Sequence, residues 1–290
     1  MTSFLNTPRG RFFYREHPGQ QPCLLFLHGN LGTSRWWSPI LQRLPDGWRG
    51  IAYDAIGYGR SDRSQDLTKF SVPGRLRDLI AFIEGLGLSH IHLIAHSTAT
   101  PVAIEYALLA PDNLATLTLI GPVPTSGVKT PPEAYPYLEH LPADRDLQAK
   151  ALRASAPHFD HATPEAQALL NDIAALDPLT LPAIARGLDA WQPGDRLRQL
   201  TTPVMIVRGY DDLMLDEKQA HQTLLSIPGA GNLEMLHGAG HSPMLETPEG
   251  LTELLVTFIS DDWETFETIR QRFDEEEEKY DDELKKPPHR

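Results

Sequence analysis

The chain has 290 residues, of which 41% are hydrophobic and 22% charged, an ordinary composition for a globular protein with one large core. Its net charge of −13 argues against a nucleic-acid partner, because the phosphates would be repelled. No stretch approaches the roughly 18 uncharged apolar residues of a membrane span, and the first residues lack the apolar segment of a signal peptide. The single cysteine excludes an intrachain disulfide, so we expect a cytoplasmic protein without membrane insertion.

Apolar runs and helix-period segments alternate along the chain. The predicted strands lie at 23–27, 50–53, 91–95, 115–120, 203–207 and 232–236. The predicted helices lie near 34–44, 74–86, 98–110, 216–226 and 247–259. This alternation is typical of a mostly parallel sheet with helices on both faces.

The alternation breaks between two of the predicted strands. Short amphipathic pieces near 144–156, 163–175 and 180–190 occupy a stretch rich in proline and alanine. We interpret 122–198 as a helical lid over the carboxyl ends of the strands, where open α/β sheets bind ligands. The predicted organisation is therefore a core of residues 1–121 and 199–260, the lid 122–198, and a C-terminal segment 261–290.

The C-terminal segment 261–290 carries 12 acidic and 6 basic side chains. We expect a helix that frays into an acidic tail, because the last part is too charged to pack as a core. Either a solubilising extension or a docking element fits this composition.

Ser97 follows the predicted strand 91–95 at the point where a helix begins. A sharp turn between a strand and a helix needs small residues two places before and after the serine, and here both are alanines, Ala95 and Ala99. Such a turn exposes a serine hydroxyl as a nucleophile. The pattern alone is weak, because small residues around a serine are common.

A serine nucleophile needs a base and an acid that holds the base. His241 lies in a glycine-bearing loop after the last predicted strand and is the best candidate for the base. Asp211 and Asp212 end the strand before it, and the residues alone do not decide between them. Without this context, His241 would be an ordinary surface histidine and both aspartates ordinary turn residues.

An oxyanion intermediate needs two backbone N–H donors. The loop after strand 23–27 has glycines that allow its N–H groups to turn toward the serine, and the N–H of Thr98 lies at a helix N-terminus. No metal or other cofactor is needed for this chemistry. His158 and His161 have a spacing that suits a metal, but no third ligand is evident, so we interpret them as ordinary histidines.

Over residues 4–260 the chain resembles the α/β-hydrolase family. The matching segments are His28-Gly29-Asn30, 53–62, 95–99, 209–212 and 240–246. The resemblance implies an α/β-hydrolase fold with Ser97 as nucleophile, His241 as base and Asp212, rather than Asp211, as acid. It also implies Asn30 and Thr98 as oxyanion donors, with Leu31 as the alternative to Asn30.

The resemblance also narrows the reaction. Haloalkane dehalogenases and epoxide hydrolases have an aspartate where this chain has Ser97, whereas esterases, lactonases and cofactor-free haloperoxidases have the serine. We expect hydrolysis of an ester, lactone or similar acyl bond of a small to medium, largely apolar substrate, with Trp37, Trp191 and Leu213 in the substrate pocket. A non-catalytic ligand-binding or signalling protein, and an acyltransferase or perhydrolase, are the alternatives. The oligomeric state is not predicted.

Overall fold

The computed structural model describes residues 1–261 and Trp263, and its centre is one sheet of eight strands. The strand order is β1-β2-β4-β3-β5-β6-β7-β8. The strands are β1 (Thr2–Thr7), β2 (Gly10–His17), β3 (Cys23–Leu27), β4 (Arg49–Tyr53), β5 (Ile91–His96), β6 (Leu114–Ile120), β7 (Val204–Gly209) and β8 (Ala230–Leu236). The hairpin β1–β2 pairs antiparallel to β4, and the pairs from β4 to β8 are all parallel.

The strand order reverses next to β3. From β3 the chain crosses to β4 on one side, and it then returns to β5 on the other side. The loops that follow β3 and β5 therefore separate at the carboxyl edge of the sheet and leave a crevice there, which is where open parallel sheets bind ligands.

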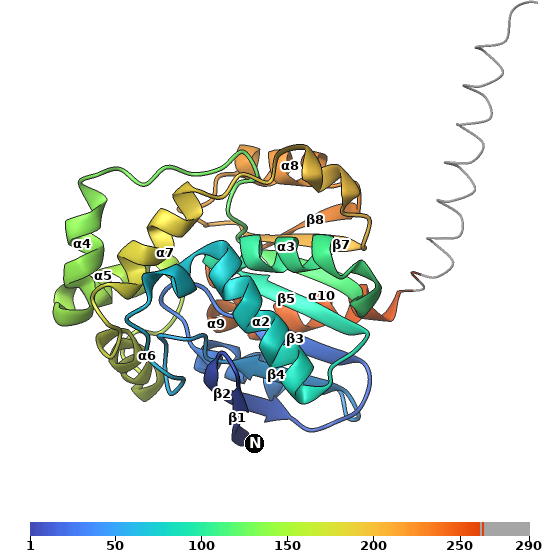
Figure 1. The fold of residues 1–290 in the computed structure, drawn as a ribbon, viewed down its shortest axis with the longest axis horizontal. Coiled ribbons are helices and arrows are strands. Elements are labelled where there is room, and N and C mark those ends of the chain that lie inside the picture. Colours follow the sequence, from blue (N-terminus) through green and yellow to red (C-terminus); the bar gives the residue numbers. More distant parts are fainter. Residues whose placement is uncertain (262, 264–290) are drawn as a thin grey trace, which may run out of the picture.

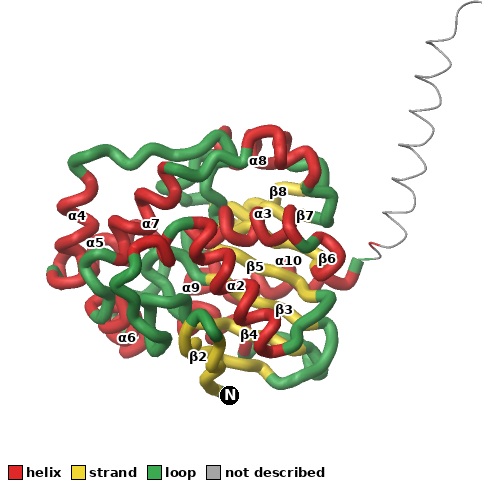
Figure 2. Tube along the Cα trace, viewed as in Figure 1, coloured by secondary structure: helices red, strands yellow, loops and turns green. Residues whose placement is uncertain are grey.

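Helices cover both faces of the sheet (Figures 1 and 2). The core helices are α1 (Ser38–Leu41), α2 (Val72–Leu86), α3 (Thr100–Leu109), α8 (Glu217–Ser226), α9 (Pro243–Glu246) and α10 (Pro248–Ser260). Alternate residues of β3 pack on opposite faces, so Leu25 joins a cluster with α2 and α3, while Leu24 and Phe26 join a cluster with α1 and α10. Both faces of the central strands are buried, which explains the continuous apolar run of β3.

A helical insertion between the end of β6 and the start of β7 lies to one side of the sheet (Figure 1). It contains α4 (Ala134–His140), α5 (Arg145–Ser155), α6 (Pro164–Ala174) and α7 (Thr180–Asp189), with short 3-10 turns at Leu141–Ala143 and Gly194–Gln199. Side-chain caps begin two of these helices: Asp144 accepts from the N–H groups of Asp146 and Leu147, and Thr163 accepts from that of Ala166.

The α/β-hydrolase fold predicted from the sequence is confirmed, but some elements differ. The N-terminal hairpin was not predicted, and the expected helix 34–44 is a 3-10 turn (Ser34–Trp37) followed by the short α1. Except for Asp261 and Trp263, the predicted C-terminal segment 261–290 lies outside the described residues. Within the described residues, no helix combines the length and apolarity that a membrane crossing requires.

Candidate active site

Ser97 occupies a strained turn between β5 and α3. Its φ of 52° lies in the left-handed region, which a non-glycine residue adopts only when its surroundings enforce it. Ala95 and Ala99 are fully buried, as expected where strand and helix nearly touch. The Thr100 hydroxyl donates to the Ser97 carbonyl at 2.7 Å, which compensates for the N–H that Pro101 cannot supply. The chain therefore holds the turn without glycines.

Ser97, His241 and Asp212 form one continuous hydrogen-bonded chain. The His241 Nε2 lies 2.9 Å from the Ser97 Oγ, and its Nδ1 lies 2.8 Å from the Asp212 Oδ2. The other carboxylate oxygen of Asp212 accepts from the N–H groups of Met214 and Leu215 at 2.8 and 3.0 Å. Burial opposes ionisation of Asp212, but these hydrogen bonds and His241 hold its pKa below the ordinary value. The carboxylate is thus charged and fixed in orientation.

The two neighbouring aspartates point to different partners. Asp211 turns to the helical insertion, where its Oδ2 lies 2.7 Å from the His158 Nε2, and both side chains are 45% exposed. Only Asp212 reaches His241. The structure therefore brings Asp212, and not Asp211, to the His241 ring.

Two buried residues fix His241 from behind. Gly121 follows β6 with a φ of 52°, and a Cβ there would lie 2.8 Å from the His241 Cε1, so only glycine fits. His96 Nε2 donates to the carbonyl oxygen of His241 at 2.8 Å. Burial and the neighbouring His241 lower the pKa of His96 to about 3, so this imidazole is a neutral hydrogen-bond donor.

The loop after β3 lies directly against the serine. A Cβ on Gly29 would be 2.9 Å from the Ser97 Cβ, so the close approach requires glycine. The Thr98 hydroxyl donates to the Asn30 Oδ1 at 3.1 Å and ties this loop to the turn. In the described part of the chain, the N–H groups of Asn30 and Leu31 have no protein acceptor and are available to a ligand.

His28 orients the peptide that follows it. Its Nε2 accepts from the N–H of Ala55 at 3.0 Å, so its Nδ1 carries the proton and donates to the Gly29 carbonyl at 2.8 Å. Burial lowers the pKa of His28 to about 4, which keeps the ring neutral. In a trans peptide the next N–H points opposite to the carbonyl, so the N–H of Asn30 points away from His28.

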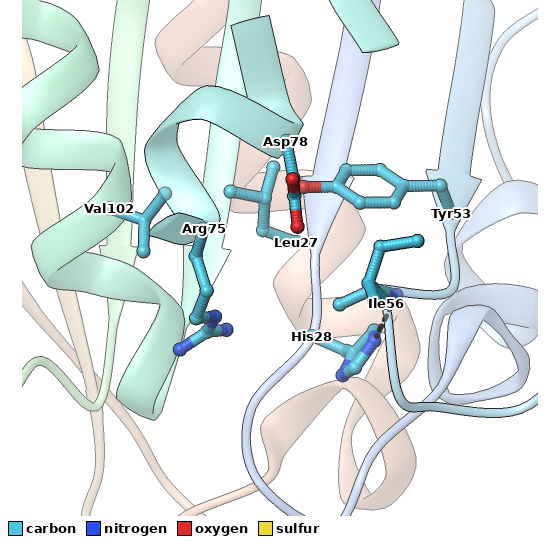
Figure 3. A pocket seen from close by; sticks show the side chains of 8 residues that line it. Leu27, His28, Tyr53, Ile56, Arg75, Asp78 and Val102 are labelled. Carbon is cyan, nitrogen blue, oxygen red and sulfur yellow. Dashed lines mark hydrogen bonds between the residues drawn. The ribbon is translucent and has the colours of Figure 1, made fainter. Parts of the chain in front are cut away.

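Behind His28 lies a cavity of about 20 Å³, shown in Figure 3 with Tyr53, Arg75 and Asp78 on its wall. This volume suits about one water molecule and no organic substrate. Arg75 donates to the Thr98 carbonyl at 2.7 Å, so it supports the turn behind the serine.

The three predicted pocket residues have different surroundings. Trp37 has no exposed surface and packs on Phe26 with ring centroids 5.0 Å apart, so the prediction that it contacts substrate is wrong: it belongs to the sheet core. Trp191 is only 5% exposed and donates to Glu105 at 2.8 Å, an attachment of the insertion to α3. Leu213 follows Asp212 and is 82% exposed, so its role in substrate binding stays a prediction.

The two histidines considered for a metal do not form a ligand set. His158 pairs with Asp211, and His161 Nε2 donates to the Ala156 carbonyl at 2.9 Å. No group of three or more histidine, cysteine or acidic side chains within residues 1–261 could hold a metal ion.

Known proteins are similar to this chain in sequence and in structure. The sequence model of the alpha/beta hydrolase family matches residues 24–254. The chain belongs to the alpha/beta hydrolase family. RutD of Caulobacter vibrioides, a candidate carbamate hydrolase, is 26% identical over 267 residues, which are 85% of this chain and 94% of that protein.

Solved structures share the fold at lower identity. A lipase candidate from Acinetobacter baumannii AYE superposes with a TM-score of 0.79 at 23% identity, covering 89% of this chain and 90% of the other. The enol-lactonase of Burkholderia xenovorans LB400 superposes with a TM-score of 0.76 at 16% identity, covering 89% of this chain and all of the other. Hydrolases of several substrate classes therefore share this architecture.

Some residues that shape the site had no predicted role. His96 is the last residue of β5, and Gly121 directly follows β6. A position at the end of an apolar strand predicts that a residue lies at the carboxyl edge of the sheet. Glu246 lies five residues after His241 and accepts a hydrogen bond from the N–H of Gly240 at 2.8 Å. Nothing in the sequence pattern identifies that partner.

Proposed function

We propose that this protein is a serine hydrolase that cleaves a carboxylic ester, lactone or similar acyl bond through an acyl-enzyme. The observation that carries the proposal is the hydrogen-bonded chain of Ser97, His241 and Asp212 at a strained turn. Esterases and lactonases among the similar structures support the choice of acyl chemistry. The substrate class we propose is a small to medium, largely apolar acyl compound.

The reaction proceeds in two acyl transfers. The Ser97 Oγ attacks the carbonyl carbon while His241 Nε2 takes its proton, and the charged Asp212 stabilises the imidazolium. The N–H groups of Asn30 and Thr98 stabilise the oxyanion, an effect of roughly 3–4 kcal/mol for one donor in related enzymes. The leaving alcohol departs with the proton from His241. Water then loses a proton to the same imidazole and its oxygen attacks the acyl carbon. The bond from that carbon to the Ser97 Oγ breaks, and the imidazolium returns the proton to Ser97 as the acid leaves.

The first test is intact-mass spectrometry after incubation with a fluorophosphonate, which traps a serine that its histidine activates. We expect a single adduct on the wild type and none on Ser97→Ala, followed by turnover of an ester and lactone panel. A folded wild type without an adduct would contradict the proposal and favour a ligand-binding protein on the same scaffold. A higher product yield with an alcohol or peroxide than with water would favour an acyltransferase or perhydrolase.

A further inference from the structure

The helical insertion touches the loop that carries His241. Pro157 lies so close to Gly240 that a Cβ on this glycine would be 2.4 Å from the Pro157 Cδ. Beside this contact, the hydroxyls of Ser155 and Ser242 lie 2.6 Å apart, and both serines are buried. The residues before and after His241 therefore rest on the end of α5 and the turn that follows it.

Glu246 joins the two segments at this contact. One carboxylate oxygen accepts from the N–H of Gly240 at 2.8 Å, and the other accepts from the N–H of His158 at 2.8 Å. Gly240 immediately precedes His241, whereas His158 belongs to the insertion. Two donors approach two different oxygens, so both bonds require the two acceptor atoms that a carboxylate has and a carboxamide lacks.

We propose that Glu246 is a positioning residue for His241, because its carboxylate fixes the loop that carries the imidazole and fixes that loop to the helical insertion. This inference rests on the proposed function of His241 as the base. The imidazole must keep its distances to both Ser97 and Asp212, and the residues before it form a loop with glycines at 238 and 240. A shift of about 1 Å in such an arrangement can cost about 100-fold in rate.

The surroundings of Glu246 agree with this role. Burial raises the pKa of its carboxyl group, which the hydrogen bonds from His158 and Gly240 partly oppose. The half-buried Glu246 is the last residue of the four-residue helix α9. Its carboxylate accepts from two N–H groups, at 158 and 240, that are 82 residues apart in sequence. These contacts connect the loop to the insertion.

The test compares Glu246→Gln with Glu249→Gln. The second variant removes the same charge three residues further on, where Glu249 is 80% exposed and pairs with Arg43 at 3.1 Å. We expect Glu246→Gln to lower the rate of fluorophosphonate labelling at Ser97 by about tenfold or more, with kcat reduced and KM little changed. Glu249→Gln should label at the wild-type rate. Equal labelling rates in wild type and Glu246→Gln would overturn the proposal.

A second variant tests whether the contact between the loop and the insertion affects the labelling rate by itself. Ser155→Ala removes the hydroxyl that faces Ser242 but leaves the bond between Glu246 and Gly240. We expect its labelling rate to stay within about twofold of wild type, since the base keeps its anchor. A loss as large as that of Glu246→Gln would assign the effect to the insertion contact and overturn the role of Glu246.

Proton NMR distinguishes failure of this inference from failure of the proposed function. The His241 Nδ1–H donates to Asp212, and its low-field signal is assigned by its absence in His241→Gln. The signal should persist in Glu249→Gln and be lost or broadened in folded Glu246→Gln, whether or not the wild type reacts with the probe. An unchanged signal in Glu246→Gln would contradict the positioning role even if the protein proves to be inactive.

Discussion

The strand-end site and the helical insertion are held in different ways. At the site, the backbone and buried groups determine the geometry. Ser97 has a left-handed backbone, and Gly121 lies against the His241 ring. Two backbone N–H groups donate to the Asp212 carboxylate. The insertion packs buried apolar residues against the core, and it is also attached through polar side chains that are partly exposed. These attachments are Arg35–Asp172 at 2.8 Å, Arg196–Glu105 at 2.7 Å and His158–Asp211 at 2.7 Å.

The proposed reaction depends on the buried geometry of the site, whereas the exposed ion pairs attach the insertion that lies beside it. Changes at the site displace reacting atoms, whereas exposed ion pairs each contribute only about 0–1 kcal/mol to stability. These exposed attachments of the insertion can therefore change at little cost in stability. Variants on each side of this division make the comparison quantitative.

The adjacent aspartates give the largest expected contrast. Asp212→Asn removes the charge beside His241 and favours the wrong imidazole tautomer, so we expect labelling of Ser97 to fall by about 10⁴-fold. Asp211→Asn affects only the exposed pair with His158 and should change the rate by less than about threefold. Labelling kinetics measure both. Similar losses in the two variants would break the distinction between the site and the attachments.

A pair of left-handed glycines gives the next contrast. Gly121→Ala and Gly127→Ala both introduce a side chain at a positive φ, 52° and 87°, and each should cost about 1 kcal/mol of unfolding free energy. Only the first also pushes a methyl group into the His241 ring, whereas the nearest atom to the second is 3.6 Å away. We expect about a 100-fold loss of labelling in Gly121→Ala alone. Denaturant unfolding and labelling together check both effects.

Asp172→Asn tests an attachment that lies beside the loop after β3. Asp172 accepts from the Thr33 hydroxyl at 2.9 Å and from Arg35 at 2.8 Å, so the change weakens the hold on α6. We expect the free energy of unfolding to fall by about 1 kcal/mol, and KM to rise a few-fold at unchanged kcat. Arg43→Gln, which removes a surface pair with Glu249 of α10, is the control. A loss of kcat in Asp172→Asn, with KM unchanged, would place this contact with the site.

The last prediction concerns the pH dependence of folding stability and a buried histidine of β5. Burial lowers the pKa of His92 to about 4 from an ordinary value of 6.5. Between these values the unfolded chain binds the extra proton, so folding stability is fully present above pH 6.5 and is lost as pH falls toward 4. His92→Gln should reduce this slope by on the order of 1 kcal/mol per pH unit. Denaturant titrations across this pH range measure the slope. An unchanged slope in His92→Gln would mean that the folded protein keeps this imidazole charged.

The sequence predicts most of the fold because buried parallel strands must be continuous apolar runs. The N-terminal hairpin escaped prediction because β1 is mostly exposed and its only strong apolar signal is the pair Phe4 and Leu5. The prediction for Trp37 is wrong because its position after the loop that follows β3 says nothing about the direction of its ring, which packs into the core.

The site could be predicted as far as each residue follows a strand end. Ser97, His241 and the pair of aspartates all satisfy that rule. The residues alone leave Asp211 and Asp212 open, and only the resemblance implies Asp212. The N–H groups of Met214 and Leu215 that hold its carboxylate become visible in the structure. The bond from His158 to Glu246 spans 88 residues and depends on how the insertion folds back, so no local pattern encodes it.

The order of the strands has a consequence for the growing polypeptide. Ser97 and His241 lie 144 positions apart, and the helical insertion is synthesised between them. Early in synthesis the chain has its serine turn but no imidazole to take the proton. The hydrogen-bonded chain closes only after β8, the last strand of the sheet, has been added at its edge. Reactivity toward a fluorophosphonate therefore reports a completely synthesised and folded sheet, and truncation before His241 would leave an inert serine.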